Sequence, residues 1–208
     1  MTPLNPIQLA TYILVRHANR PITPMKLQKL AYYTKVWTLV AEQPFVNADF
    51  QKWQYGPVNP SIYHEFKQFR SKAITPPERA VSLSAEQTQL IDFILDSYVH
   101  LSAFALSAMT HREGPWLNAA NGAIITDDAI LSYYGQLPFA KNFNDLSNLF
   151  DGEYHVLQTE SWHAFTMDMT AQDAAEFERY QSYRDYKRVA ERAERDVEQL
   201  ITELFGQS

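Results

Sequence analysis

Helix-start signals recur along the first two thirds of this chain, and they constrain its fold more than any other feature. Asn5-Pro6 and Thr23-Pro24 each place a proline at the first helical position after a capping side chain, where the missing N–H costs nothing. Further capping residues precede later runs of helical spacing: Ser84, with Gln87 as the second member of a capping box, and Thr126. Another helix is expected to begin near Ser102. We therefore predict a mainly α fold, with a compact multi-helix domain over residues 1–137.

A different pattern occupies residues 45–60. Bulky apolar and aromatic residues, among them Phe50, Trp53 and Tyr55, follow one another without helical spacing. They predict an extended segment with at most a small strand pair near residues 50–55. Gly56-Pro57 predicts a turn, because Pro57 disfavours the helical conformation at Gly56. Gly114-Pro115 is interpreted as similar punctuation between helices.

Composition limits what the chain can do. Its 208 residues suit one domain, or one domain with an appendage, and 46% of them are hydrophobic. No apolar run approaches the length that spans a bilayer, and the first residues lack the basic and apolar regions of a secretory signal. The absence of cysteine fits a reducing cytoplasm, and the net charge of −6 argues against nonspecific binding of nucleic acid. We expect a cytoplasmic protein with no membrane partner.

Residues that carry chemistry are sparse. The six histidines are scattered, and no pair has the spacing of a metal-binding helix. There is no glycine-rich phosphate loop, no nucleophile elbow and no thiol. The sequence therefore predicts no catalytic residue, no metal site and no cofactor, and we expect a protein that is not an enzyme.

Three short blocks combine backbone punctuators with bulky side chains. They contain Thr23, Pro24, Lys26, Leu27, Gln28, Lys29, Leu30, Tyr32 and Tyr33; then Trp53, Tyr55, Gly56, Pro57 and Val58; then Thr110, His111, Pro115 and Trp116. In this order and at these separations, the blocks resemble the Panacea domain, the SocA-like antitoxin family of bacterial and phage toxin–antitoxin pairs. The resemblance spans about residues 5–137. It implies an antitoxin that neutralises a cognate protein toxin by direct complex formation, with the blocks serving as scaffold or interface.

The first two blocks each have a second interpretation. Thr23-Pro24 followed by Lys26 and Lys29 is compatible with a DNA recognition helix, although the aromatic residues on the same helix favour a core element with both lysines solvated. Trp53 and Tyr55 are residue types enriched at interface hot spots, and they are equally suited to hold a turn against the second helix. We favour the buried position for both blocks.

The third block gives the most enzyme-like group. Thr110, His111 and Glu113 bring a hydroxyl, an imidazole and a carboxylate together in the sequence. The same residues are typical of a helix C-terminus, where a histidine meets the negative end of the helix dipole. The resemblance favours this structural role for His111. An enzyme centred on His111, an operon DNA-binding regulator, and a phage or host interaction module such as a protease adaptor stay open as alternatives.

The last third of the chain lies outside the resemblance and is assigned to a C-terminal extension, residues 138–208. It ends in a predicted long amphipathic helix over about residues 171–205, which carries a narrow apolar seam. The candidate partner-binding residues on this seam are Tyr183, Tyr186, Val197, Leu200 and Leu204. The seam needs a second helix, which this domain, a second copy of the chain or the toxin could each supply, so a homo-oligomer is one possibility.

Overall fold

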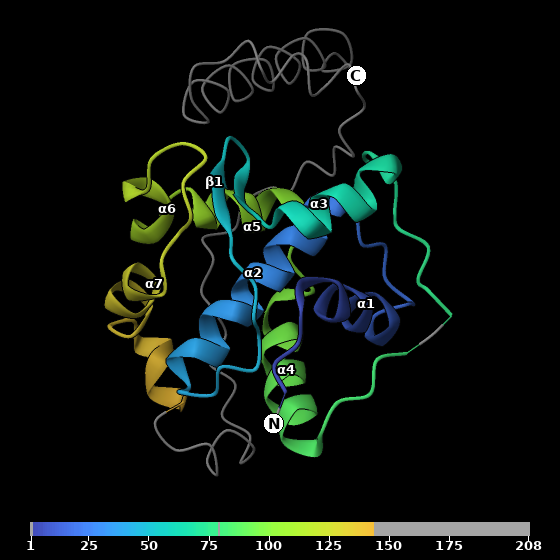
Figure 1. Ribbon diagram of the computed structural model, residues 1–208, viewed down its shortest axis with the longest axis horizontal. Helices are drawn as coiled ribbons and strands as arrows, with labels where there is room; N and C mark the ends of the chain where they lie inside the picture. Colours follow the sequence, from blue (N-terminus) through green and yellow to red (C-terminus); the bar gives the residue numbers. More distant parts are fainter. Residues whose placement is uncertain (1, 79, 144–208) are drawn as a thin grey trace, which may run out of the picture. The chain divides into compact units, whose positions relative to one another are not determined.

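The computed structural model describes residues 2–78 and 80–143, which form seven α-helices, a two-stranded sheet and two short 3-10 helices (Figure 1). In chain order these are α1 (Pro6–Arg16), α2 (Pro24–Val40), β1 (Gln51–Trp53), β2 (Gly56–Val58), α3 (Pro60–Phe66), η1 (Lys67–Phe69), α4 (Ala85–Tyr98), α5 (Ala103–Thr110), α6 (Gly114–Asn118), α7 (Asp127–Tyr134) and η2 (Pro138–Phe143). The prediction of a mainly α fold with a small strand pair is confirmed. The predicted helix over residues 171–205 lies outside the described residues.

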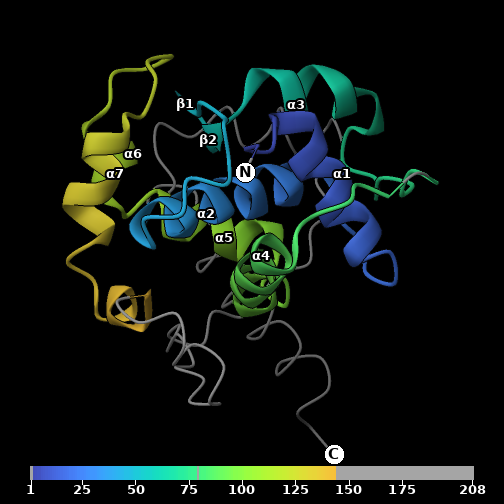
Figure 2. The ribbon, with the colours of Figure 1, turned by 60° about the horizontal axis from the view of Figure 1, so that its bottom comes forward.

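Helix α2 forms the centre of the fold. Helices α1, α3, α4, α5 and α7 and strand β2 all pack against it, and Figure 2 shows α2 with α1 and α3 on one side and α4 and α5 on the other. Every residue from 27 to 38 is consequently buried. The hydroxyls of Thr34 and Thr38 donate to the carbonyls of Leu30 and Thr34, each at 2.8 Å, which satisfies polar side chains that cannot reach solvent.

The predicted helix starts are confirmed. Asn5 and Gln8 form a reciprocal capping box at α1, and Ser84 and Gln87 form another at α4. Thr23, Ser102 and Thr126 each accept a hydrogen bond from the backbone N–H three residues ahead. Local side-chain chemistry therefore determines where five of the helices begin.

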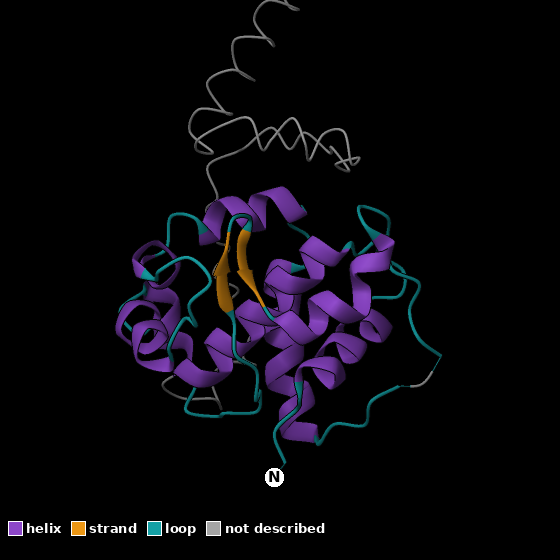
Figure 3. Cartoon of the chain, turned by 45° about the horizontal axis from the view of Figure 1, so that its top comes forward, coloured by secondary structure: helices purple, strands orange, loops and turns teal. Residues whose placement is uncertain are grey.

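The strand pair lies slightly later than predicted, and the predicted turn at Gly56-Pro57 is wrong. Gln51 pairs with Val58, Lys52 with Pro57 and Trp53 with Gly56, so the turn contains Gln54 and Tyr55 (Figure 3). Proline has no N–H to donate to a partner strand. This is tolerated at Pro57 because its partner Lys52 directs its backbone groups away from β2: its N–H donates to the carbonyl of Ala123 at 2.9 Å, and its carbonyl accepts from the N–H of Gly122 at 2.8 Å. Gly56 has a φ of 102°, which is indeed outside the helical region.

Gly114-Pro115 lies at a boundary between helices, where it begins helix α6. Proline suits the first turn of a helix because the first N–H groups have no partner within it. The helix is only five residues long, too short to show a periodic pattern in the sequence.

An aromatic cluster closes the C-terminal end of α2. The ring of Trp37 stacks on Phe143 with centroids 5.3 Å apart and meets the edges of Phe139 and Tyr134. The indole N–H of Trp37 donates to the hydroxyl of Tyr98 at 2.7 Å. The packed core thus includes residues beyond 137, where we placed the domain boundary.

Helices α4 and α5 together have the length and composition of a membrane span, but they are bent by 98°, and no single helix among the described residues has both properties.

Candidate functional site

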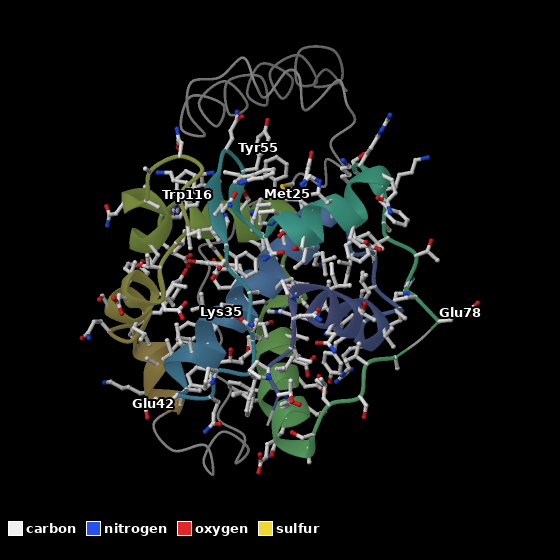
Figure 4. All side chains as sticks on the ribbon, viewed as in Figure 1. Met25, Lys35, Glu42, Tyr55, Glu78 and Trp116 are labelled. Atoms are coloured by element: carbon white, nitrogen blue, oxygen red, sulfur yellow. The ribbon has the colours of Figure 1, made fainter. Side chains whose placement is uncertain are left out.

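The three sequence blocks meet at the β1–β2 hairpin. The first block forms the N-terminal half of α2, the second forms most of the hairpin, and the third covers the end of α5 and the start of α6. Figure 4 shows Tyr55 and Trp116 at this end of the molecule, with Glu42 at the opposite end of α2. The fold therefore brings together segments more than fifty residues apart in the sequence.

Side chains from three helices hold the hairpin by its backbone oxygens. Ser107 Oγ donates to the carbonyl of Tyr55 at 3.0 Å, and Lys29 Nζ donates to that of Pro57 at 3.0 Å. His111 Nε2 lies 2.9 Å from the carbonyl oxygen of Gln54, and Trp116 Nε1 donates to the carbonyl of Trp53 at 3.2 Å. We call the four side chains of Lys29, Ser107, His111 and Trp116 the hairpin latch.

Gly56 lets the hairpin approach the latch closely. A Cβ atom at this position would lie 2.7 Å from Lys29 Nζ and 2.7 Å from Thr110 Oγ1. Its φ of 102° is also a conformation that side chains rarely adopt. Both space and backbone geometry therefore require glycine in the second block.

Lys29 is buried, which corrects the expectation that both lysines of the first block are solvated. Its side chain is inside the core, 1% exposed, and burial lowers its pKa to about 7. Lys26 is partly buried. Burial of α2 along residues 27–38 leaves this stretch without an exposed polar face of the kind that a recognition helix presents to a DNA groove.

A second set of contacts fixes the start of helix α3. The side-chain amide of Gln28 donates to the carbonyl of Asn59 at 3.1 Å, and its oxygen accepts from the Asn59 N–H at 2.9 Å. Asn59 also caps α3 through its bond to the Ile62 N–H and donates to the carbonyl of Asp49. Sequence analysis did not identify Asn59, although Asn-Pro before a helical run is a recognisable cap signal.

The carboxylate of the partly buried Glu113 accompanies the latch, and in the sequence it belongs only to the enzyme-like group of the third block. Tyr33 Oη donates to Glu113, 3.0 Å and 3.1 Å from its two oxygens, and Tyr134 Oη donates to Glu113 Oε2 at 2.5 Å. Burial raises the pKa of Glu113 to about 7, and the two tyrosine bonds act in the opposite direction. We call Glu113, Tyr33 and Tyr134 the tyrosine–carboxylate cluster.

The hydroxyl, imidazole and carboxylate of the third block do not bond to one another. Thr110 Oγ1 donates to the carbonyl of Ser107 at 2.8 Å. His111 Nδ1 lies 2.6 Å from the same carbonyl oxygen, while Nε2 faces the hairpin and the ring packs on Trp116 with centroids 4.1 Å apart. Glu113 binds the two tyrosines instead. Of the three, only His111 contacts the hairpin, while Thr110 bonds within α5 and Glu113 links α2 to α7.

The positions of the eighteen block residues share one property: none of them is exposed. Eleven are buried, and these are Leu27, Gln28, Lys29, Leu30, Tyr32, Tyr33, Gly56, Pro57, Val58, Thr110 and Pro115. The partly buried ones are Thr23, Pro24, Lys26, Trp53, Tyr55, His111 and Trp116. The candidate partner-binding residues Tyr183, Tyr186, Val197, Leu200 and Leu204 lie outside the described residues. Within residues 2–78 and 80–143, no group of three His, Asp or Glu side chains is placed to hold a metal ion.

Part of this chain is similar to known proteins. Residues 27–117 match the family described as antitoxin SocA-like, Panacea domain, a range that contains all of the second and third blocks. Antitoxin SocA of Caulobacter vibrioides (strain NA1000 / CB15N) is 31% identical over 116 residues, which cover 49% of this chain and 62% of that protein. The match thus spans less than two thirds of the relative. No solved structure gives a significant match. The resemblance predicted from the three blocks is confirmed.

Proposed function

We propose that this chain, which carries a SocA-like Panacea domain over residues 27–117, is an antitoxin that neutralises a cognate protein toxin by binding it directly. The observation that carries the proposal is the family match together with the relative named Antitoxin SocA. The geometry supports a binding protein, because the polar side chains of the blocks are engaged in contacts between elements of the fold.

In this proposal the eighteen block residues act as scaffold. The hairpin latch donates to backbone oxygens, so it fixes the shape of the hairpin whatever side chains the hairpin displays. A scaffold of this kind leaves the exposed residues of α3, the hairpin turn and α6 to determine which partner binds.

The test is co-expression with the product of the adjacent gene. If that product inhibits growth, the chain should restore growth, co-purify with it, and protect only near stoichiometric expression, because a noncovalent inhibitor has no turnover. His111→Ala and Thr110→Ala variants should protect in proportion to their folded fraction, since neither residue acts in catalysis here.

Protection at strongly substoichiometric expression, with no isolable complex, would contradict direct neutralisation. Dependence of that protection on a cellular protease would support the adaptor alternative, and loss of protection in a fully folded His111→Ala variant would support an enzyme.

A further inference from the structure

Basic residues are concentrated in the N-terminal part of the chain, although the chain as a whole is acidic. Residues 1–72 hold nine of the 18 Lys and Arg residues but three of the 24 Asp and Glu residues, so their formal charge is +6 while that of the chain is −6. Five of these cations belong to the loop before α2, the first turn of α2, and the end of α3 with the turn after it. They are Arg20, Lys26, Lys67, Arg70 and Lys72, and we call them the basic ridge.

Backbone contacts bring the members of the ridge together. The N–H of Ile74 donates to the carbonyl of Ile22 at 2.9 Å, which joins the segment after η1 to the loop before α2. Burial lowers the pKa of Lys26, and the nearby charge of Arg20 lowers it further. In Figure 4, side chains with nitrogen ends project outward from the turquoise segment that contains α3.

The ridge has no carboxylate partners in the described part of the chain. Two other cations of the fold do have such partners: Arg16 pairs with Asp92 at 2.9 Å and Lys35 with Asp127 at 3.1 Å. None of the five ridge residues forms an ion pair with a described residue. Like charges held near one another raise the local positive potential, which attracts an anionic partner.

An aromatic pair borders the ridge. Tyr63 lies on α3 one turn before Lys67, and its side chain is 40% exposed. Its ring packs against Trp53 at the end of β1, with centroids 4.9 Å apart. An exposed tyrosine supported by a tryptophan and bordered by charge has the composition of a protein–protein interface, with an aromatic anchor and a polar rim.

We infer that Tyr63 and the basic ridge form a docking surface for an acidic surface of the toxin, an inference that rests on the proposed function. A protein partner fits better than a nucleic acid because of the charge beyond the ridge. The described residues 73–78 and 80–143 hold two Lys and Arg but seven Asp and Glu, a formal charge of −5. A long polyanion would meet this charge, whereas a compact acidic patch contacts the ridge alone.

The experiment measures association of the full chain with the purified product of the adjacent gene at two salt concentrations. Lys67→Glu should weaken binding about fivefold and the Lys67→Glu/Lys72→Glu double variant about twentyfold, mainly through slower association at low salt. Lys141→Glu is the matched control, because it makes the same charge change at an exposed lysine of η2 and should alter affinity less than about twofold. Tyr63→Ala should weaken binding about tenfold at both salt concentrations.

Each result separates the two proposals. If the wild-type chain does not bind the toxin, the proposed function fails and the docking surface fails with it. If the wild-type chain binds but the double variant matches Lys141→Glu, only the docking surface is overturned. A tighter complex in the double variant also overturns the docking surface, because the positive charge of the ridge would then oppose toxin binding. The surface is also reassigned if a 20-base-pair DNA duplex binds the wild-type chain and loses affinity in the double variant while toxin binding is unchanged.

Discussion

The hairpin latch and the tyrosine–carboxylate cluster each hold an ionisable side chain inside the fold without an ion pair to another described residue. The ionisable group is basic in the latch and acidic in the cluster. In the latch, Lys29 presents a basic amino group to the carbonyl of Pro57, a neutral backbone oxygen. In the cluster, Glu113 presents an anionic group to the hydroxyls of Tyr33 and Tyr134. Lys29 belongs to α2 and Glu113 bonds to Tyr33 of α2, and burial is the main cause of both pKa shifts. The comparison shows that a buried ionisable group can organise the core through neutral partners instead of an ion pair.

The two groups have opposite effects on the pH dependence of stability. The pKa of Glu113 rises from 4.5 to about 7 on folding, so the folded state binds more protons between these values and stability falls as pH increases. The pKa of Lys29 falls from 10.5 to about 7, so the unfolded state binds more protons above pH 7 and stability rises with pH. The combined contribution of the two groups to the free energy of unfolding should therefore be lowest near pH 7.

The largest expected effect concerns Glu113. Between pH 4.5 and 7 its contribution to the free energy of unfolding should fall by about 3 kcal/mol, since one pKa unit corresponds to about 1.4 kcal/mol. Urea unfolding of the wild type and Glu113→Gln across this range measures the contribution as the difference between the two curves. The subtraction also cancels the contribution of buried His17 to the free energy of unfolding. Because burial lowers the pKa of His17, its contribution to stability rises with pH below pH 6.5, opposite to that of Glu113. Parallel curves for the two proteins would show that Glu113 titrates normally.

Lys29 tests the other half of the comparison. From pH 7 to 9 the wild type should gain about 2.5 kcal/mol relative to Lys29→Met, because the unfolded lysine stays protonated while the buried one does not. The range stops at pH 9 because burial raises the pKa of Tyr33 and Tyr134, and ionisation of tyrosine in the unfolded chain reverses the trend at higher pH. A difference between the two proteins that does not change with pH would refute a neutral Lys29 in the fold.

The importance of the latch region could be predicted from the sequence, whereas the contacts of Glu113 with the two tyrosines could not, for a physical reason. Gly56, His111 and Trp116 are residue types with strong local preferences, and their order along the chain was enough for the family resemblance. Glu113 lies at the N-cap position of α6, where a carboxylate ordinarily bonds to the helix N-terminus, yet its side chain makes no capping bond. Its contacts with Tyr33 and Tyr134 depend on tertiary packing, which no local pattern encodes.

The errors within the latch region have the same origin. The helical spacing predicts a solvated Lys29 only if one side of α2 is exposed. In the fold α2 is instead enclosed by α1, α4, α5, α7 and the hairpin, so Lys29 is buried. The turn was placed at Gly56-Pro57 because these residues disfavour helix, but the same properties allow a strand that approaches Lys29 closely. Helix caps were predictable because each cap is complete within four residues.

The requirement for glycine in the latch predicts a smaller effect, with a control in the same chain. Gly56→Ala should destabilise the fold by about 2 kcal/mol more than Gly122→Ala. Both glycines have a positive φ, 102° at Gly56 and 76° at Gly122, so each substitution carries a backbone cost. A Cβ at Gly122 meets no atom within 4 Å, whereas one at Gly56 meets Lys29 and Thr110. Equal free energies of unfolding for the two variants would show that contact with the latch is unimportant.

The smallest effect distinguishes a structural His111 from a catalytic one. His111→Ala removes the contacts of the ring with Gln54 and Trp116 and should lower the free energy of unfolding by roughly 1 to 2 kcal/mol. Loss of the ring exposes the hairpin oxygen of Gln54 to water, so the cost stays below that of a fully buried polar group. Calorimetry gives the stability, and titration against the toxin gives the affinity of the folded fraction, which should be unchanged because the ring faces the hairpin backbone. A variant of wild-type stability that fails to neutralise the toxin would instead place His111 at the functional surface and would make the latch part of the binding machinery.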